Sequence, residues 1–135
     1  TQSRSSAASD VYKRQDWSLA EAAPEADTPA GRIWRGTKHI LAVRTEIEAL
    51  RGDVPTKVMH TGHDKLFCVR RPGTEGTLTG VYNFTGEDQQ IEADRLGLDI
   101  GALPLDMLTG MLPERAADRI VVPSYGALWL HEALW

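Results

Sequence analysis

Between residues 30 and 51 the apolar side chains recur at spacings of three and four, the period of a helix with one buried face. Thr28 and Pro29 suit the start of this helix, because a threonine hydroxyl accepts from a free backbone amide and proline has no amide to satisfy. Gly52 suits its end, where a left-handed residue often closes a helix. The stripe itself consists of Ile33, Trp34, Thr37, Ile40, Leu41, Ile47 and Leu50.

This stripe holds more large apolar side chains than one sheet face needs, so we expect the helix to pack on something outside this chain. The stretch before it, residues 16–27, is rich in alanine and glutamate and is broken by Pro24. It is typical of a short helical turn followed by a loop.

After Pro55 the period of the apolar residues changes to two, which indicates strands. Glycine-rich and polar turns separate the strands, and each strand would turn one face to a core. The pattern predicts a mainly β module, an antiparallel β-sandwich, after the one long helix. The expected strands are residues 56–61, 65–71, 78–85, 89–93, 105–109, 119–122 and 127–131.

Composition narrows the class of protein without identifying a function. The 135 residues are enough for one domain with a real core, and 15 basic against 19 acidic residues give a net charge of -4. That balance argues against a nucleic-acid or anionic-membrane partner. One cysteine, Cys68, cannot form an internal disulfide, and no apolar run is long enough to span a membrane. We therefore expect a cytoplasmic protein.

Residues 1–15 are rich in serine and alanine and have neither helical nor strand periodicity. We expect them to be disordered, because they would bury too little to repay the entropy of ordering. The string SSAASDVYKRQ also resembles translated sequencing-adapter read-through, and we interpret the segment as an adapter-derived tail. The alternative is a genuine flexible terminus or a cloning remnant.

A pair of histidines and the single cysteine are the candidates for a metal-binding or reactive site. His60 and His63 could bind zinc with Asp64 or His131, but they span a strand end and a turn, so two surface histidines are favoured. Cys68 lies in an apolar strand and is interpreted as a small buried hydrophobic residue. We therefore predict no metal ion and no cofactor.

Two sets of charged residues suggest no site either. The carboxylates lie in loops with no sign of the facing pair that glycoside hydrolysis needs, and Asp106 is interpreted as a capping or turn residue. They are Asp94, Asp99, Asp106, Glu114 and Asp118. The basic residues of the helix are interleaved with apolar positions and indicate a solvated face that pairs with carboxylates. They are Arg32, Arg35, Lys38, His39 and Arg44.

Aromatic residues leave one alternative open. Tyr82, Trp129 or Trp135 could stack on a sugar, as in a stand-alone carbohydrate-binding module, although an isolated tryptophan in a strand is more often core. No residue of the chain is predicted to be catalytic.

Several segments, in order, resemble the C-terminal end of family 13 glycoside hydrolases, the α-amylase superfamily. Residues 31–53 resemble the last helix of the catalytic barrel, with Glu48 where that pattern usually has proline. Asp16 and Trp17, followed by Ala20, resemble the M-D-W-x-x-A stretch of amylosucrase-like members. Four later segments resemble the C-terminal domain: residues 65–71 (L-F-x-F-x-R), 81–85 (V-x-N-F-S), 105–110 (D-x-L-T-G) and 122–130 (L-x-P-Y-x-x-x-W-L).

This resemblance implies a division at residue 53: residues 16–53 would end a (β/α)8 barrel, and residues 54–135 would form its C-terminal Greek-key β-sandwich. The parent would be a retaining enzyme that cleaves an α-glucosidic bond, often of sucrose, and transfers glucose to an acceptor or water. Its catalytic residues would all precede residue 16. We therefore expect an inactive C-terminal fragment that stabilises the missing barrel and meets α-glucosides only through that barrel.

Overall fold

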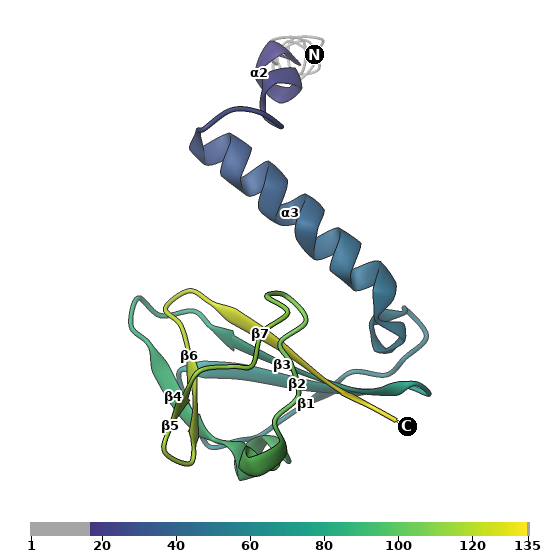
Figure 1. Ribbon diagram of the computed structural model, residues 1–135, viewed down its shortest axis with the longest axis vertical. Helices are drawn as coiled ribbons and strands as arrows, with labels where there is room; N and C mark the ends of the chain where they lie inside the picture. The colour runs from purple at the N-terminus through teal and green to yellow at the C-terminus, as the bar shows by residue number, and fades with distance from the viewer. Residues whose placement is uncertain (1–16, 135) are drawn as a thin grey trace, which may run out of the picture. The chain divides into compact units, whose positions relative to one another are not determined.

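The computed structural model describes residues 17–134 and divides the chain into two units, one ending at Leu41 and one beginning at Ala42. Two helices belong to the N-terminal part, α2 (Trp17–Ala22) and α3 (Pro29–Glu46) (Figure 1). Thr28 caps α3 as the sequence predicts, since its Oγ1 accepts from the backbone N of Gly31 at 3.1 Å. The tail at residues 1–15, interpreted above as adapter-derived, lies outside the described residues.

The long helix ends earlier than its sequence pattern predicts. It stops at Glu46, Ile47 is extended, and a 3-10 turn η1 (Glu48–Leu50) follows, so Gly52 does not cap a helix. The physical reason is tertiary: Ile47 and Ala49 are buried in a hydrophobic cluster. A straight helix would not present both residues to that cluster.

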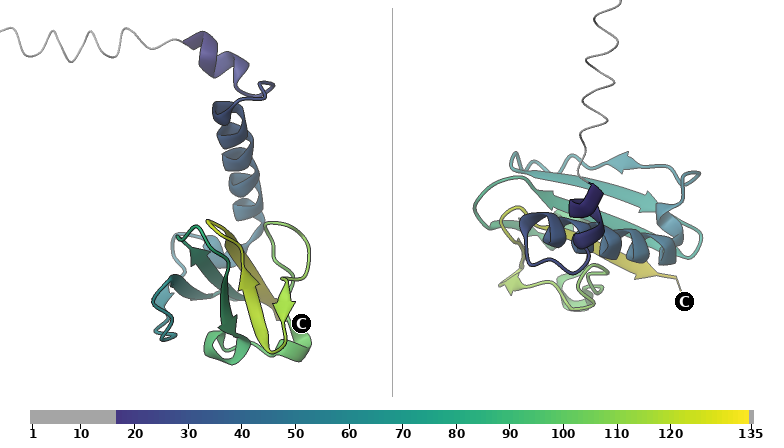
Figure 2. Two further views of the ribbon diagram at one scale, coloured as in Figure 1. Left: turned by 90° about the vertical axis from the view of Figure 1, so that its left-hand side faces the viewer. Right: turned by 90° about the horizontal axis from the view of Figure 1, so that it is seen from above.

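The second unit is a sandwich of two antiparallel sheets that lie face to face (Figure 2). One sheet has the order β1-β2-β3-β7 and the other the order β4-β6-β5. After β3 the chain builds the second sheet and then returns as β7 beside β3, the crossover expected of a Greek key. The strands are β1 (Lys57–Val58), β2 (Leu66–Pro72), β3 (Gly76–Asn83), β4 (Gln89–Glu92), β5 (Arg115–Ala116), β6 (Arg119–Val122) and β7 (Ala127–Ala133).

One predicted strand is wrong, and one observed strand was not predicted. Residues 105–109 form a turn and not a strand, because the buried carboxylate of Asp106 binds the backbone around it. Its Oδ1 accepts from the amides of Leu108 and Trp129, and its Oδ2 accepts from the Thr109 hydroxyl. The short strand β5 was not predicted, since its two residues show no alternation and only their pairing with β6 defines them.

The main core lies between the two sheets. Alternation along β3 turns Val81 and Asn83 inward and Leu78 and Tyr82 outward, and the inward side chains of the other strands meet Val81. The cluster consists of Leu66, Cys68, Val81, Ile91, Ala93, Leu96, Leu98, Ile120, Val122, Leu128 and Leu130. The predicted β-sandwich is thus confirmed, with Cys68 in its core.

A second hydrophobic cluster covers part of the outer face of the four-stranded sheet. Leu78 and Trp129 supply the sheet side of this cluster, and Ile47 and Ala49 cover them from the turn after α3. Val43, in the last turn of α3, packs against the same cluster. The four-stranded sheet is therefore apolar on both faces.

Asn83 joins two loops at one end of the sandwich. Its side-chain Nδ2 donates to the carbonyl oxygens of Glu87, Val122 and Pro123 at 2.8, 3.2 and 2.9 Å. Its Oδ1 accepts from the backbone N and the hydroxyl of Thr85. Because this side chain is almost fully buried, all of its hydrogen-bonding capacity is used inside the protein.

Replacing Asn83 tests this account of the fold. Asn83→Leu keeps the volume but leaves buried carbonyl groups without a donor, so we expect a loss of about 3 kcal/mol in the free energy of unfolding. Gln90→Leu, at an exposed position of β4, serves as the control and should change stability by less than about 0.5 kcal/mol. Urea unfolding measures both, and equal effects would contradict the role given to Asn83.

Candidate functional site: an exposed apolar helix face

The most distinctive surface of the described chain is the apolar stripe of α3. Ile33 and Leu41 are 69% and 52% exposed, and Trp34 is also exposed. With neighbouring side chains they line a shallow groove, made by Ala23, Ala30, Ile33, Trp34, Thr37, Lys38 and Leu41. Large apolar side chains gathered in one groove mark an interaction surface more often than isolated ones do.

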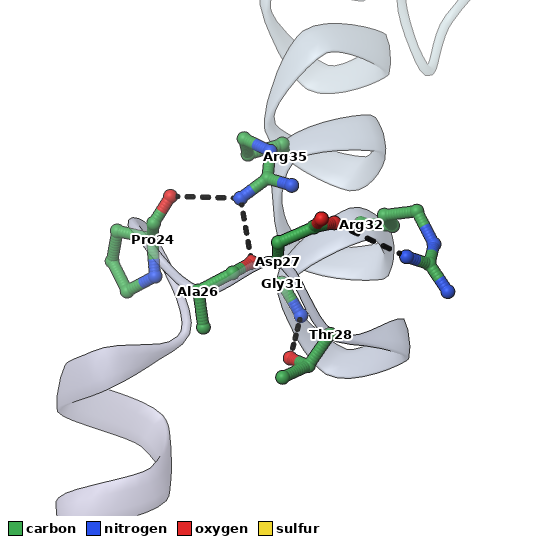
Figure 3. A network of polar contacts seen from close by, with 7 residues as sticks. All are labelled: Pro24, Ala26, Asp27, Thr28, Gly31, Arg32 and Arg35. Carbon is green, nitrogen blue, oxygen red and sulfur yellow. Dashed lines mark hydrogen bonds and ion pairs between the residues drawn. The ribbon is translucent and has the colours of Figure 1, made fainter.

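The turn between α2 and α3 gives this groove a defined shape (Figure 3). Arg35 Nη1 donates to the carbonyl oxygens of Pro24 and Ala26 at 3.1 and 3.0 Å. Gly31 is buried against the same turn, and a Cβ atom there would collide with the Ala26 carbonyl. Ala23 is held beside α3 as one wall of the groove.

Three basic residues of α3 have local partners. Arg32 pairs with Asp27 at 3.3 Å, which agrees with the predicted pairing to neighbouring carboxylates. Arg35 is used by the turn, and Lys38 Nζ lies 5.1 Å from the centre of the Trp34 ring. Of these three residues, only Lys38 lines the apolar groove.

Two charged side chains fasten the segment after α3 to the sandwich. Arg71, on β2, donates to the carbonyl oxygens of Ala49, Arg51 and Val54 and to the Thr56 hydroxyl. Glu48, at the position where the resembling pattern has proline, accepts from the backbone N of Thr74 at 2.9 Å. The segment after α3 is thus held to the sandwich by hydrogen bonds to charged groups, which are stronger than neutral ones.

Cys68 is buried as predicted, and the two histidines lie nearer the surface. His60 is exposed, and His63 accepts from the backbone N of Lys65 through its Nδ1. Within residues 17–134 no three His, Cys, Asp or Glu side chains gather as a metal site would require. Cys68 is 1% exposed, and burial raises the pKa of its thiol, an effect larger than the opposing hydrogen bond with Thr61.

Two of the predicted carboxylates have structural contacts. Asp106 is buried and satisfied, and Asp99 accepts from the backbone N of Gly101. Asp94, Asp99 and Asp118 do lie around one surface hollow together with Glu92. The pKa of Glu92 is lowered, first by a hydrogen bond from its own backbone amide and then by Arg95 and Arg119. A glycosidase acid needs the opposite shift.

Trp129, one of the residues considered for sugar stacking, does not supply an open ring. Trp129 is 8% exposed, and its Nε1 donates to the Tyr82 hydroxyl at 3.0 Å, so the interpretation of Trp129 as core is confirmed. Phe67 packs beside Tyr82 with the two rings tilted by 35°. Trp135 lies outside the described residues.

The roles of Arg71 and Asn83 were missed from the sequence. A signal exists for Asn83, because it follows Thr79 and Val81 in the inward phase of a strand, where a polar residue must find partners. None of the helices in the described part of the chain has the length and apolar character needed to cross a membrane.

The family model for the amylosucrase C-terminal domain matches residues 56–131, more than half of the chain. No curated protein matched the chain in a sequence search.

Among solved structures, AmyP in complex with maltose superposes with a TM-score of 0.60 at 14% identity, over 77% of this chain and 21% of AmyP. Trehalose-6-phosphate hydrolase (TreA) from Bacillus licheniformis superposes with a TM-score of 0.51 at 19% identity, over 72% of this chain and 18% of TreA. Amy13B from Eubacterium rectale superposes with a TM-score of 0.56 at 17% identity, over 76% of this chain and 20% of Amy13B. The chain thus spans about a fifth of these proteins.

Labelling of Cys68 tests whether the sandwich core is closed. Iodoacetamide reacts with thiolate, so the buried thiol in the native chain should react at least about a hundredfold more slowly than in concentrated urea. Gln90→Cys, at an exposed position, should react at similar rates in both states. Equal native rates for the two thiols would show that the core is open.

The raised pKa of the Cys68 thiol predicts how the stability of the chain changes at alkaline pH. Burial raises the pKa because it disfavours the charged thiolate in the native state, so the contribution of the neutral thiol to stability is complete below its ordinary pKa of 9.0. This contribution should be lost as the pH rises through the higher native pKa. Cys68→Ala should remove that part of the alkaline loss of stability.

Proposed function

Because the chain belongs to the amylosucrase C-terminal domain family, we propose that it is the non-catalytic C-terminal part of an α-amylase-family enzyme and stabilises the catalytic barrel of that enzyme. The observation that carries the proposal is the exposed apolar face of α3. A helix with this face needs a partner, and α3 would supply the last helix of a (β/α)8 barrel in the same polypeptide.

The size of the exposed face supports a permanent partner. Complete burial of a Leu, Ile or Phe side chain contributes about 1.5–3 kcal/mol, so Ile33, Trp34 and Leu41 together represent several kcal/mol. That is a large fraction of the stability of a typical domain. The junction around Arg71 would hold the sandwich to the end of this helix, so that the barrel and the sandwich stabilise one another.

The activity of the parent is proposed to be amylosucrase-like: cleavage of an α-glucosidic bond of sucrose or an α-glucan, with transfer of the glucosyl unit to an acceptor or to water. AmyP, which was solved with maltose, and TreA, a trehalose-6-phosphate hydrolase, share the fold over their matching fifth and are compatible with a sugar-acting parent. The chain by itself is proposed to be inactive, and its α-glucoside would bind to the barrel.

The upstream reading frame and an activity assay test the proposal together. We expect the DNA before residue 16 to encode an in-frame barrel, the full-length protein to act on sucrose or maltooligosaccharides, and the purified 135-residue chain to turn over neither. Turnover by the chain itself, or an upstream frame without a barrel, would contradict the proposal. Tight binding of maltooligosaccharides by the chain alone would instead favour a carbohydrate-binding module.

Substitution on the helix stripe separates docking from local folding. Ile33→Ser combined with Leu41→Ser should lower the stability of the full-length protein by about 2–5 kcal/mol, because both side chains would leave the barrel core. In the isolated chain the same pair is exposed and should change stability by less than about 0.5 kcal/mol. Chemical denaturation of both proteins measures the contrast, and a similar change in both would refute docking through this face.

A further inference from the structure

A surface hollow of about 510 Å³ lies beside β5, the edge strand of the three-stranded sheet. Its walls come from the 3-10 turn η3 (Ile100–Ala102), from Leu103 and from residues 112–115. Leu112 is 64% exposed, whereas Leu103 is half-buried. We call this hollow the edge hollow, and its lining includes Ile100, Leu103, Leu112, Pro113 and Arg115.

Hydrogen bonds hold the walls of the edge hollow in place. Arg115 Nη1 donates to the carbonyl oxygen of Ile100 at 2.7 Å and so joins β5 to η3. Asp99 caps η3, because its Oδ1 accepts from the backbone N of Gly101 at 2.8 Å. A surface that is already shaped loses little conformational entropy when a partner binds.

Opposite charges lie around Ile100. Arg115 lines the edge hollow, and the acidic hollow that includes Asp94 and Asp118 adjoins it, because Ile100 lines both. Asp118 lies in the turn between β5 and β6. Within residues 17–134, Arg115, Asp94 and Asp118 have no ion-pair partner. The chain therefore presents a cation and two anions whose charges it does not neutralise itself.

We propose that the edge hollow and Asp118 together bind a second copy of this chain across a twofold axis. In such an interface each residue of one copy meets its counterpart's neighbour on the other copy, and the reverse. A surface with an apolar centre, a cation and an anion is then complementary to itself. Leu112 of each copy would enter the hollow of the other, and Arg115 of each would pair with Asp118 of the other. This dimer needs no barrel, because every residue in it belongs to the unit that begins at Ala42.

The charges disfavour other classes of partner. A nucleic acid or an anionic membrane requires clustered positive charge, but Arg115 is the only basic residue that lines the edge hollow and carboxylates lie next to it. A purely apolar partner would remove these charges from water without pairing them, which is costly. With one apolar side chain and one ion pair from each copy at its centre, the interface is small, so we expect a weak dimer with a micromolar dissociation constant.

Sedimentation equilibrium of the 135-residue chain tests this proposal. Between about 1 and 500 µM we expect a reversible change from monomer to dimer. Leu112→Glu places a charge in the apolar centre and should raise the dissociation constant at least about tenfold. Met111→Glu is the matched control, because Met111 is 65% exposed and does not line the hollow. It should change the dissociation constant less than about threefold, and equal effects of the two substitutions would overturn the inference.

Exchange of the two charges tests the pairing across the axis. Arg115→Asp and Asp118→Arg should each weaken the dimer, because each brings like charges together. The double variant restores opposite charges and should dimerise within about threefold of the original chain. Both positions are exposed, so each variant should keep the native circular-dichroism spectrum. A double variant no better than the single ones would overturn the inference, since a role inside one copy predicts no such rescue.

The exposed stripe of α3 is a second possible cause of self-association, and a further variant separates the two. Ile33→Ser combined with Leu41→Ser removes the apolar side chains of the stripe, and the dimer should persist in this variant. Loss of association in this variant would assign it to α3 and overturn the inference while leaving the proposed function standing. A chain that stays monomeric at the highest concentration would also overturn it.

Discussion

The four-stranded sheet is apolar on both faces, so it must be covered twice, and the arrangement of the sandwich follows from this constraint. The inner face is covered by the sheet β4-β6-β5, which closes the main core around Val81. The outer face is covered only over the cluster around Trp129, by the residues that follow α3. The helix ends at Glu46 because Ile47 is needed in that cover. The junction, the helix end and the exposed aromatic residues are therefore consequences of a single two-sided sheet.

Elements whose boundaries depend on local patterns could be predicted from the sequence, and those set by distant contacts could not. Strand β3 is bounded by turn residues, and α3 starts with a capping threonine, so both were found. The end of α3 depends on the burial of Ile47 against residues far away in sequence. Residues 105–109 have apolar positions like a strand, but the Asp106 carboxylate accepts from Trp129 and from its own turn, and no periodicity reports that contact.

The exposed apolar surfaces also differ in whether they could be predicted from the sequence. The stripe of α3 was predicted because a period of 3.6 identifies a buried face even when its partner is missing. The exposed residues Val58 and Phe67, on the outer face of the four-stranded sheet, were not predicted to form a surface, although residues 66–69 are apolar at every position, which indicates a strand covered on both faces. The contact between the Phe67 and Tyr82 rings depends on the pairing of β2 with β3, which the sequence alone does not show. The buried role of Trp129 removed the main support for a sugar platform on this face.

Hydrogen exchange along α3 tests the central claim, that this helix is folded against a barrel in the parent enzyme, most directly. An amphipathic helix gains most of its stability from packing, and the stripe of Ile33, Trp34 and Leu41 is exposed in this chain. The amides of residues 33–41 should therefore exchange rapidly in the 135-residue chain and at least about a hundredfold more slowly in the full-length protein. Equal exchange in the two proteins would contradict the account.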